Sequence, residues 1–236
     1  MTLKDKRVLV IGGGSGIGFG VAKGAASEGA QVMIASRDAK KIAEAAKSIG
    51  ATSAVLDVRE ETDIAQFFNE HGAFDHIAFT AGDSEGIVPG ALADLDLAKA
   101  AARMTTRFWG AVAVAKHGAI RLPAGGSYTI TNGMLARRPR KGMPMVTASA
   151  CAAEGLALGL AVDLAPVRVN CVCPGLIETE LWDKFPREAL TAMAHKQLVP
   201  RPGQPAEAAE AYLTCMRNTF LTGQVIRVEG GIALAN

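Results

Sequence analysis

Short apolar runs alternate with longer segments of helical periodicity along the whole chain. The runs have strand length and end at glycine or polar residues, as strands buried on both faces of a parallel sheet do. We expect strands at 7–11, 31–35, 53–56, 75–80, 126–131, 167–172 and 225–229. We expect helices at 16–29, 39–49, 60–71, 97–122 and 146–164. The alternation predicts an α/β fold, a doubly wound seven-stranded parallel sheet with helices on both faces.

Two features lie outside this simple alternation. The expected helix at 97–122 contains Gly110 and Gly118, which we expect to interrupt it. The segment 178–204 is rich in proline and charge and precedes the last strand. Long connections of this kind are commonly functional, so we interpret residues 178–204 as a lid over a substrate.

Length and composition favour one compact, soluble unit. A chain of 236 residues suits a single domain, residues 1–236. Acids and bases are interspersed and the formal net charge is +2, which gives no reason to expect nucleic acid or an anionic membrane as partner. We find no signal-peptide pattern and no apolar run of the ~18 residues that a membrane span needs. We therefore expect a cytoplasmic protein.

The four cysteines do not form a recognisable metal or redox motif. Cys171 and Cys173 are separated by one residue, which is the wrong spacing for a CxxC pair. On a strand they would share one face, and free cysteine is commonly a small buried hydrophobe. No metal site is expected.

A glycine-rich turn connects the first strand to the first helix. Glycine permits a tight turn and lets backbone N–H groups approach a pyrophosphate. The helix N-terminus adds the positive end of its dipole and free N–H donors. The turn therefore predicts a dinucleotide site. Its expected contacts are Gly12, Gly14, Ser15, Gly16, Ile17 and Gly18.

The spacing Gly12-xxx-Gly16-x-Gly18 resembles that of the short-chain dehydrogenase/reductases rather than the GxGxxG of longer dehydrogenases. Further segments resemble the same family in the same order and extend the likeness over nearly the whole chain. They are Leu56-Asp57-Val58, Thr80-Ala81-Gly82, Arg168 to Thr179, and Thr222 to Gly231. The resemblance implies a Rossmann fold that binds a nicotinamide dinucleotide and a small-molecule substrate. It also implies a homodimer or homotetramer formed through the two long helices and the last strand.

The resemblance assigns further cofactor contacts residue by residue. Asp57 and Val58 correspond to the pair that lines the adenine, and Thr80 takes the place of an asparagine in the family's Asn-Ala-Gly. The segment after the sixth strand corresponds to the one that holds the nicotinamide end. The contacts implied are Asp57, Val58, Thr80, Ala81, Gly82, Thr131, Pro174, Gly175, Ile177 and Thr179.

The residues after the second strand favour NADP(H) over NAD(H). An NAD enzyme usually places an acid here to bind the ribose 2′-hydroxyl. This chain has Ser36 and Arg37 instead. A hydroxyl and a guanidinium suit a 2′-phosphate, because arginine can bind phosphate bidentately. We expect Asp38 to cap the following helix.

The catalytic group of the family is missing. The family's Tyr exchanges a proton, its Lys lowers the Tyr pKa, and its Ser holds the substrate oxygen. The resemblance places Val146 at the Tyr position, Ala150 at the Lys position, and Asn132 or Gly133 at the Ser position. Arg107 stands where the family has a helix asparagine. We therefore take Arg107 and Asn132 as the candidate catalytic residues, since both can hydrogen-bond a substrate and neither is a useful acid.

Other groups are weaker candidates. Asp83 follows the Ala-Gly turn, and His195 lies in the expected lid. The basic run 137–141 lies beside the expected substrate pocket and would attract an anionic substrate, although a solvated loop accounts for it as well. Tyr128 in the fifth strand and Tyr212 on a late helix are not placed for catalysis, and we expect His117 at the surface.

Three functions are compatible with an intact cofactor site and a missing Tyr/Lys pair. The first is an atypical NADPH-dependent reductase of a carbonyl or imine, with positioning by binding and a proton from water or none needed. The second is a non-redox cyclase or isomerase that retains the dinucleotide. The third is a non-catalytic NADPH-binding sensor or partner protein. The retained Pro174 to Thr179 segment favours redox chemistry.

Overall fold

The computed structural model describes residues 2–82 and 90–235. It contains a parallel sheet of seven strands in the order β3-β2-β1-β4-β5-β6-β7. The strands are β1 (Arg7–Ile11), β2 (Gln31–Ser36), β3 (Thr52–Val55), β4 (His76–Phe79), β5 (Ser127–Thr131), β6 (Arg168–Pro174) and β7 (Val225–Val228). The predicted doubly wound fold is confirmed. Because β1 pairs with both β2 and β4, the connections reverse direction there, and a crevice opens at the carboxyl ends of these strands.

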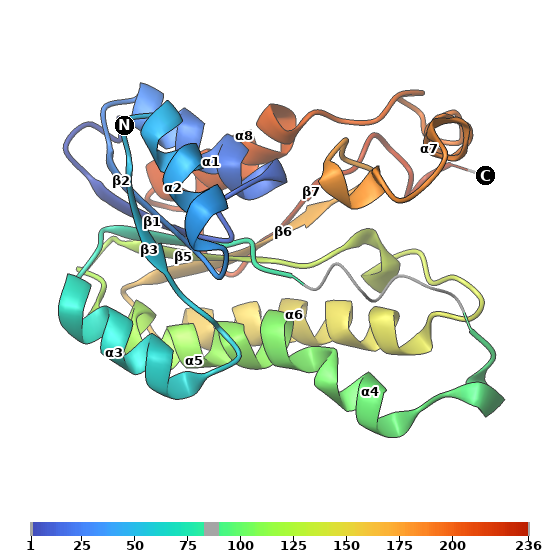
Figure 1. Ribbon diagram of the computed structural model, residues 1–236, viewed down its shortest axis with the longest axis horizontal. Helices are drawn as coiled ribbons and strands as arrows, with labels where there is room; N and C mark the ends of the chain where they lie inside the picture. The colour runs from blue at the N-terminus through green and yellow to red at the C-terminus, as the bar shows by residue number, and fades with distance from the viewer. Residues whose placement is uncertain (1, 83–89, 236) are drawn as a thin grey trace.

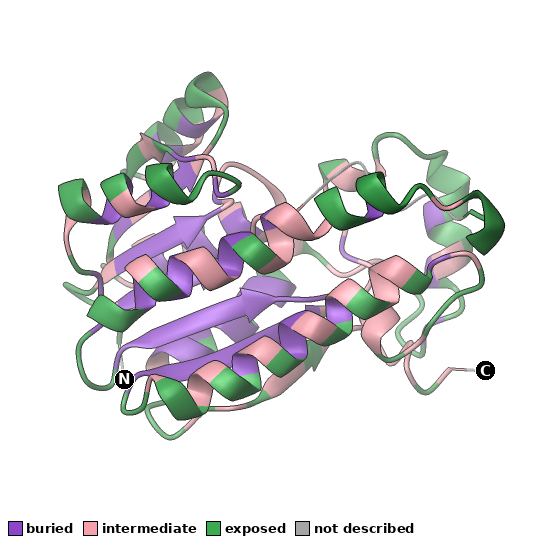
Figure 2. Cartoon of the chain, turned by 90° about the horizontal axis from the view of Figure 1, so that it is seen from below, coloured by how far each residue is buried: buried purple, intermediate pink, exposed green. Residues whose placement is uncertain are grey.

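Helices cover both faces of the sheet (Figure 1). One layer contains α1 (Gly16–Ser27), α2 (Ala39–Ser48) and α8 (Pro205–Arg217). The other contains α3 (Glu61–His71), α5 (Gly110–His117) and α6 (Pro144–Asp163). Each layer has its own hydrophobic core, one around Val10 and Tyr212 and the other around Leu9 and Phe68. Figure 2 shows that the central strands between them are buried while the outward faces of the helices are exposed.

The helix expected at 97–122 is divided, but Gly110 does not divide it. The segment begins with α4 (Leu97–Ala102), passes through a π-helical turn over Thr105–Trp109, and continues as α5. Gly110 is instead a packing residue, since a Cβ there would lie 2.9 Å from the Val58 carbonyl oxygen. Gly118 ends α5 as expected. Single π turns are frequent at functional sites, and this one carries Arg107.

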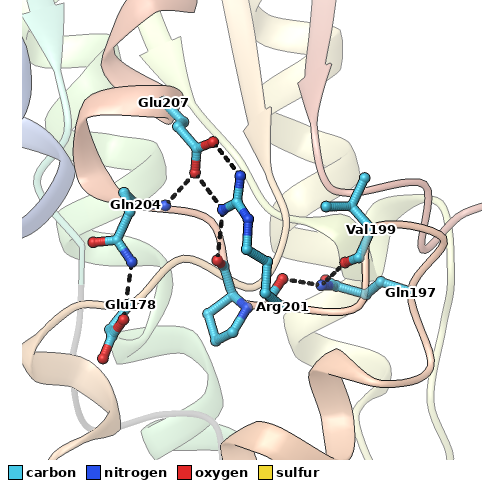
Figure 3. Close-up of polar contacts among 7 residues, drawn as sticks. Glu178, Gln197, Val199, Arg201, Gln204 and Glu207 are labelled. Atoms are coloured by element: carbon cyan, nitrogen blue, oxygen red, sulfur yellow. Dashed lines mark hydrogen bonds and ion pairs between the residues drawn. The ribbon is translucent and has the colours of Figure 1, made fainter.

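The segment 178–204 contains a short 3₁₀ turn, Glu180–Trp182, and the helix α7 (Arg187–Ala194). Its two ends are joined to each other: Gln204 Nε2 donates to Glu178 Oε2 at 2.9 Å, and the Glu178 N–H donates to the Gly203 carbonyl at 2.8 Å. Arg201 and Glu207 form a two-pronged ion pair at the start of α8 (Figure 3). This pairing lowers the pKa of Glu207 to about 2. The segment is a closed loop anchored on α8, and its action as a lid stays a prediction.

From the sequence we expected no apolar segment long enough to span a membrane, and helix α6 corrects this expectation. Among the described residues it is long and apolar enough to cross a membrane, with 20 residues and a mean hydropathy of 1.6. Its inner face, which includes Ala153 and Ala157, packs against β5 and β6 in the core. Its outer face carries Leu158 and Val162, which are exposed. The apolar composition of α6 is therefore divided between the core and an uncovered surface.

Candidate functional site

A cleft of ≈ 1460 Å³ opens at the carboxyl ends of the strands, between the helix layers and the segment 178–204. It is lined by residues from both halves of the sheet and by the 3₁₀ turn and α7. All the predicted cofactor contacts and both candidate catalytic residues line this cleft. They are Gly12, Gly14, Ser15, Gly16, Ile17, Gly18, Ser36, Arg37, Asp57, Val58, Thr80, Ala81, Gly82, Arg107, Thr131, Asn132, Pro174, Gly175, Ile177 and Thr179. Asp83 lies outside the described residues.

The glycine turn has the geometry that a pyrophosphate site requires. Gly12 has φ +87°, and a Cβ there would lie 2.7 Å from the Ala81 nitrogen. A Cβ on Gly18 would overlap the Gly12 carbonyl oxygen. Ser15 precedes α1 in an extended conformation, its side chain does not cap the helix, and the first turn holds no acid. The N–H groups at the start of α1 are thus left for an anion, which fits the phosphates of a dinucleotide.

The end of the cleft beyond β2 is basic. Ser36 and Arg37 both line it, while Asp38 accepts a hydrogen bond from the Lys41 N–H at 2.9 Å and caps α2, as expected. Lys41, which the sequence analysis did not single out, also lines the cleft and forms an ion pair with Glu180 of the 3₁₀ turn. The donor set of one hydroxyl and two cations fits a 2′-phosphate.

Asp57 and Val58, the predicted adenine contacts, line the cleft. Arg59 Nε donates to Asp57 Oδ1 at 2.9 Å and holds the pKa of that carboxyl below its usual value. Asp57 therefore presents a fixed carboxylate, which can accept a hydrogen bond from an amino group.

Val146 and Ala150, which the resemblance places at the family's Tyr and Lys positions, give the cleft an apolar wall. Both residues line the cleft, and their correspondence to a missing Tyr/Lys pair stays a prediction. The two tyrosines lie elsewhere. Tyr128 donates to the Ala111 carbonyl at 2.9 Å, and Tyr212 bonds the Thr131 hydroxyl at 2.6 Å. Burial raises the pKa of both phenols, and neither lines the cleft.

Thr131 lines the cleft, but its hydroxyl is committed to the fold. It donates to the Phe79 carbonyl at 2.7 Å and accepts from Tyr212, so it ties β5 to β4 and α8. Thr80 is used in the same way, because its hydroxyl donates to the Ile11 carbonyl at 2.9 Å. Both predicted contacts can therefore offer a cofactor mainly backbone and methyl surface.

Arg107 reaches the cleft wall from the π-helical turn. Its Nη1 donates to the Asn132 carbonyl at 3.0 Å, and its guanidinium packs on Gly82, where a Cβ would overlap it. The catalytic role of Arg107 stays a prediction. A loop carbonyl fixes the guanidinium, and the fixed group forms part of the cleft.

Glu154 is the polar residue that the sequence analysis missed. The residue is 8% exposed, and its side chain accepts a hydrogen bond from Asn132 Nδ2 at 2.7 Å and pairs with Arg137. It lies on α6, four residues after Ala150 and eight after Val146, and so on the same helix face. A signal was present, since a carboxylate on the inward face of an otherwise apolar helix needs partners.

The weaker candidates from the sequence differ in whether they lie on the cleft. In the basic run, Arg137 binds Glu154 and Arg138 donates to the Ile232 carbonyl. Arg138, Arg140 and Lys141 line the cleft. The exposed His195 does not line the cleft.

His117 is half-buried rather than fully at the surface, and it bonds Glu61 at 2.9 Å. Cys171 and Cys173 are buried as expected, and burial raises the pKa of Cys173 to about 12. Cys151, by contrast, is exposed on α6.

The chain is similar to known proteins over nearly its whole length. A family model described as enoyl-(acyl carrier protein) reductase matches residues 12–233. The short-chain dehydrogenase/reductase ucsE of Acremonium sp is 33% identical, over 99% of this chain and 97% of its own. A solved structure of the MalC reductase/Diels-Alderase from Malbranchea aurantiaca is 32% identical, with a TM-score of 0.90 over 98% of this chain and 97% of its own. A small-chain dehydrogenase solved in complex with NADPH is 34% identical, with a TM-score of 0.83 over 98% of this chain and 100% of its own.

Proposed function

Because the chain belongs to the short-chain dehydrogenase/reductase family, we propose that it is an NADPH-dependent reductase of a small-molecule carbonyl or imine that works without a Tyr/Lys pair. One observation carries this proposal. The cleft keeps the whole predicted cofactor wall, yet Val146 and Ala150 stand where the proton-transfer residues would face it. Positioning and charge stabilisation are the contributions that such a cleft retains.

The chain is an oxidoreductase that binds NADP(H). We assign the 2′-phosphate to Ser36 and Arg37 and the pyrophosphate to the N–H groups at the start of α1. We assign the nicotinamide end to the segment from Pro174 to Thr179. When bound, NADPH supplies a hydride.

Arg107 is the residue we propose to act on the substrate. A guanidinium keeps its charge at all ordinary pH values, so it polarises an oxygen or holds a carboxylate rather than giving up a proton. Its bond to the Asn132 carbonyl holds it in place before substrate arrives. Preorganised donors of this kind stabilise charge that develops during reaction. The proton itself comes from water, or none is needed when the substrate is an iminium.

The substrate end of the cleft is apolar with a basic rim. Its lining includes Met134, Met143, Met145, Met193, Trp182 and Phe185. Methionine is unbranched and polarizable, so such a wall adapts to irregular apolar shapes. Arg140, Lys141 and Lys184 lie on the same lining. We therefore propose a substrate with an apolar body and a group that tolerates or uses nearby positive charge.

A non-redox cyclase or isomerase is the second candidate. The observation that favours it is the likeness to MalC, whose structure is described as that of a reductase/Diels-Alderase. The third candidate is a non-catalytic protein that binds NADPH and acts as a sensor or as the partner of another protein. These functions predict cofactor binding without cofactor oxidation.

Assembly through α5 and α6 is a separate proposal. Among the exposed large apolar side chains are Trp109 beside α5 and Leu158 and Val162 on α6. A second copy of the chain would cover these faces and form a homodimer or homotetramer. Sedimentation of the wild type against a Leu158→Asp/Val162→Asp variant tests this, with dissociation expected for the variant.

The test of the reductase is oxidation of NADPH in a panel of carbonyl compounds and cyclic imines. We expect at least one compound to be reduced, and Arg107→Met to lower kcat/KM about 100-fold. NADPH affinity, measured by calorimetry, should change less than about threefold, since Arg107 is not assigned to the cofactor. Tight NADPH binding with no oxidation by any compound would favour the second or third function.

A further inference from the structure

Two oppositely charged side chains meet at the basic end of the cleft, one on α2 and the other on the segment 178–204. Lys41 Nζ forms an ion pair with Glu180 Oε2, and both residues line the cleft. Their side chains are 41% and 58% exposed, so a ligand in the cleft can reach both charged groups. In residues 2–82 and 90–235, no other ion pair joins the segment 178–204 to the strands and helices that precede β4. The pair therefore connects the segment 178–204 to the cofactor wall.

Lys41 lies beside a group that we assign to the 2′-phosphate. A Cβ on Gly14 would lie 3.5 Å from Ser36 Oγ and 4.0 Å from Lys41 Cγ, so the lysine stem and the serine hydroxyl border the same turn. Lysine carries rotatable donors on a flexible stem, and its ammonium can move between neighbouring acceptors without a change of backbone. Lys41 can therefore bind either Glu180 or a phosphate next to Ser36.

The charges at this end of the cleft decide which anion Lys41 binds. Arg59, another cation of the cleft lining, is held by the Asp57 carboxylate through Nε and Nη2. A phosphate monoester carries about −1.5 to −2 charges at pH 7, whereas Glu180 carries one. The phosphate is therefore the stronger competitor for an exposed lysine. When Lys41 binds the phosphate, the Glu180 carboxylate is left beside an anion and is repelled by it.

The turn that carries Glu180 also forms part of the substrate end of the cleft. Glu180 is the first residue of the 3₁₀ turn Glu180–Trp182. The rings of Trp182 and Phe185 lie 5.5 Å apart, and both residues line the cleft. A change in the bonding of Glu180 is therefore transmitted to the apolar wall within a few residues.

We propose that Glu180 competes with the 2′-phosphate of NADP(H) for Lys41. Binding of the phosphate exchanges the ion pair for a contact between Lys41 and the phosphate, and it releases the turn Glu180–Trp182 from α2. Glu180 thus lowers the affinity for NADP(H) but not for NAD(H), and it makes the mobility of the substrate wall depend on the 2′-phosphate. The inference rests on the assignment of this phosphate to Ser36 and Arg37, and it does not depend on hydride transfer.

Calorimetric titration with NADP⁺ and NAD⁺ tests the competition without turnover. Glu180→Gln should tighten NADP⁺ binding about 3- to 10-fold, because it frees Lys41 and removes a nearby anion. Lys41→Met should weaken NADP⁺ binding about 3- to 10-fold. Neither variant should change NAD⁺ affinity by more than about twofold. In the Lys41→Met background, Glu180→Gln should tighten NADP⁺ binding by less than about twofold, since no lysine is left to be freed.

Glu188→Gln and Lys40→Met are the matched controls. Glu188 lies on α7 in the same segment as Glu180, and Lys40 precedes Lys41 on α2. Both control residues are exposed and lie outside the cleft lining, and each variant makes the same change of charge as its counterpart. Both controls should leave the affinities for NADP⁺ and NAD⁺ within about twofold of the wild type. Surface substitutions of this kind should leave the fold intact.

Hydrogen exchange of the backbone amides in 180–186 tests the release of the turn. The probes are adenosine 2′,5′-bisphosphate and adenosine 5′-monophosphate, which differ in the 2′-phosphate and contain no nicotinamide that could contact the segment 178–204. The bisphosphate should raise exchange of these amides about two- to threefold in the wild type, and the monophosphate should not. In Glu180→Gln, exchange should already be raised without a ligand, and the bisphosphate should not raise it further.

The outcomes separate this inference from the assignment on which it rests. If Arg37→Glu weakens NADP⁺ and NAD⁺ equally, the phosphate does not bind at this end, and both the assignment and the competition are wrong. If Arg37→Glu weakens NADP⁺ alone while Glu180→Gln leaves NADP⁺ affinity unchanged or lowers it, the competition alone is wrong. Equal tightening of both nucleotides by Glu180→Gln, or protection or unchanged exchange of 180–186 with the bisphosphate, would also overturn the proposal.

Discussion

The amino and carboxyl ends of β4, β5 and β6 both carry buried polar side chains, but these groups differ in how they are bonded. At the amino end, His76 bonds Ser127 at 2.9 Å, and Arg168 donates to several backbone carbonyls. At the carboxyl end, Asn132 and Arg107 lie on a cleft. At the amino ends of these strands the buried polar groups are hydrogen-bonded within the protein. At the carboxyl ends some polar groups lie on the cleft, where a ligand would bind.

Arg168 shows how complete the bonding is at the amino end. Its guanidinium donates to the carbonyls of Cys215, Met216 and Asn218, at the C-terminus of α8. These carbonyls lack partners within the helix, and the helix dipole is negative there. Burial lowers the pKa of Arg168, and the carbonyl cage offsets that cost. The cation therefore joins β6 to the end of α8.

The largest change in stability should come from replacing Arg168. Arg168→Met leaves several buried carbonyls without donors, and we expect it to lower the free energy of unfolding by about 3–5 kcal/mol. Chemical denaturation measures this, and NADPH affinity in the folded fraction should stay within about twofold of the wild type. A large loss of NADPH affinity with little loss of stability would break the contrast between the two ends.

His76 gives the amino end a pH dependence. Burial, with Arg168 nearby, lowers its pKa to about 4 from an ordinary value of 6.5. Between about pH 6.5 and 4, His76 is protonated in the unfolded chain but not in the folded chain. The contribution of His76 to the free energy of unfolding is therefore complete above about pH 6.5 and is lost as the pH falls toward 4. The difference of about 2.5 units corresponds to about 3 kcal/mol. His76→Gln should remove this part of the acid sensitivity in unfolding measured from pH 7 to 4.

A control for this experiment is His117→Gln, which changes a half-buried histidine paired with Glu61 on the helix layer. It should leave most of the acid sensitivity in place. If both variants show the same pH dependence as the wild type, His76 is not the group that couples folding to protons in this range.

At the carboxyl ends of the strands, a substitution should change cofactor affinity rather than stability. Arg37→Glu replaces a cation near the assigned 2′-phosphate with an anion and should weaken NADPH binding about 30- to 100-fold, equivalent to about 2–3 kcal/mol. NADH lacks that phosphate and should bind within about threefold of its wild-type affinity. Arg37 is exposed, so the unfolding free energy should change by less than about 0.5 kcal/mol. Equal losses for the two cofactors would refute the phosphate assignment.

The sequence predicted the sheet and the residues that line the cleft well, because both depend on local patterns. Apolar runs and glycine spacing gave β1, the turn and α1 within a few residues, and Asp38 caps α2 as its position suggested. The division of the helix at 97–122 was misplaced, because a π-helical turn has no simple sequence signature. Gly110 leaves room for the backbone and side chain of Val58 and does not break the helix. Glu154 was missed because its partners are distant in sequence.

The amino-acid sequence by itself determined the fold class and NADP(H) as the cofactor, while the replacement of a proton-transfer pair by Val146 and Ala150 stays a prediction. These follow from residue identity at positions whose neighbours along the chain set their geometry. Only the tertiary structure decided which polar atoms are already bonded. It showed that the hydroxyl of Thr131 is used by the fold and that the amide of Asn132 donates to Glu154. Hydrogen bonds between side chains on different elements depend on packing in three dimensions, which no local pattern encodes.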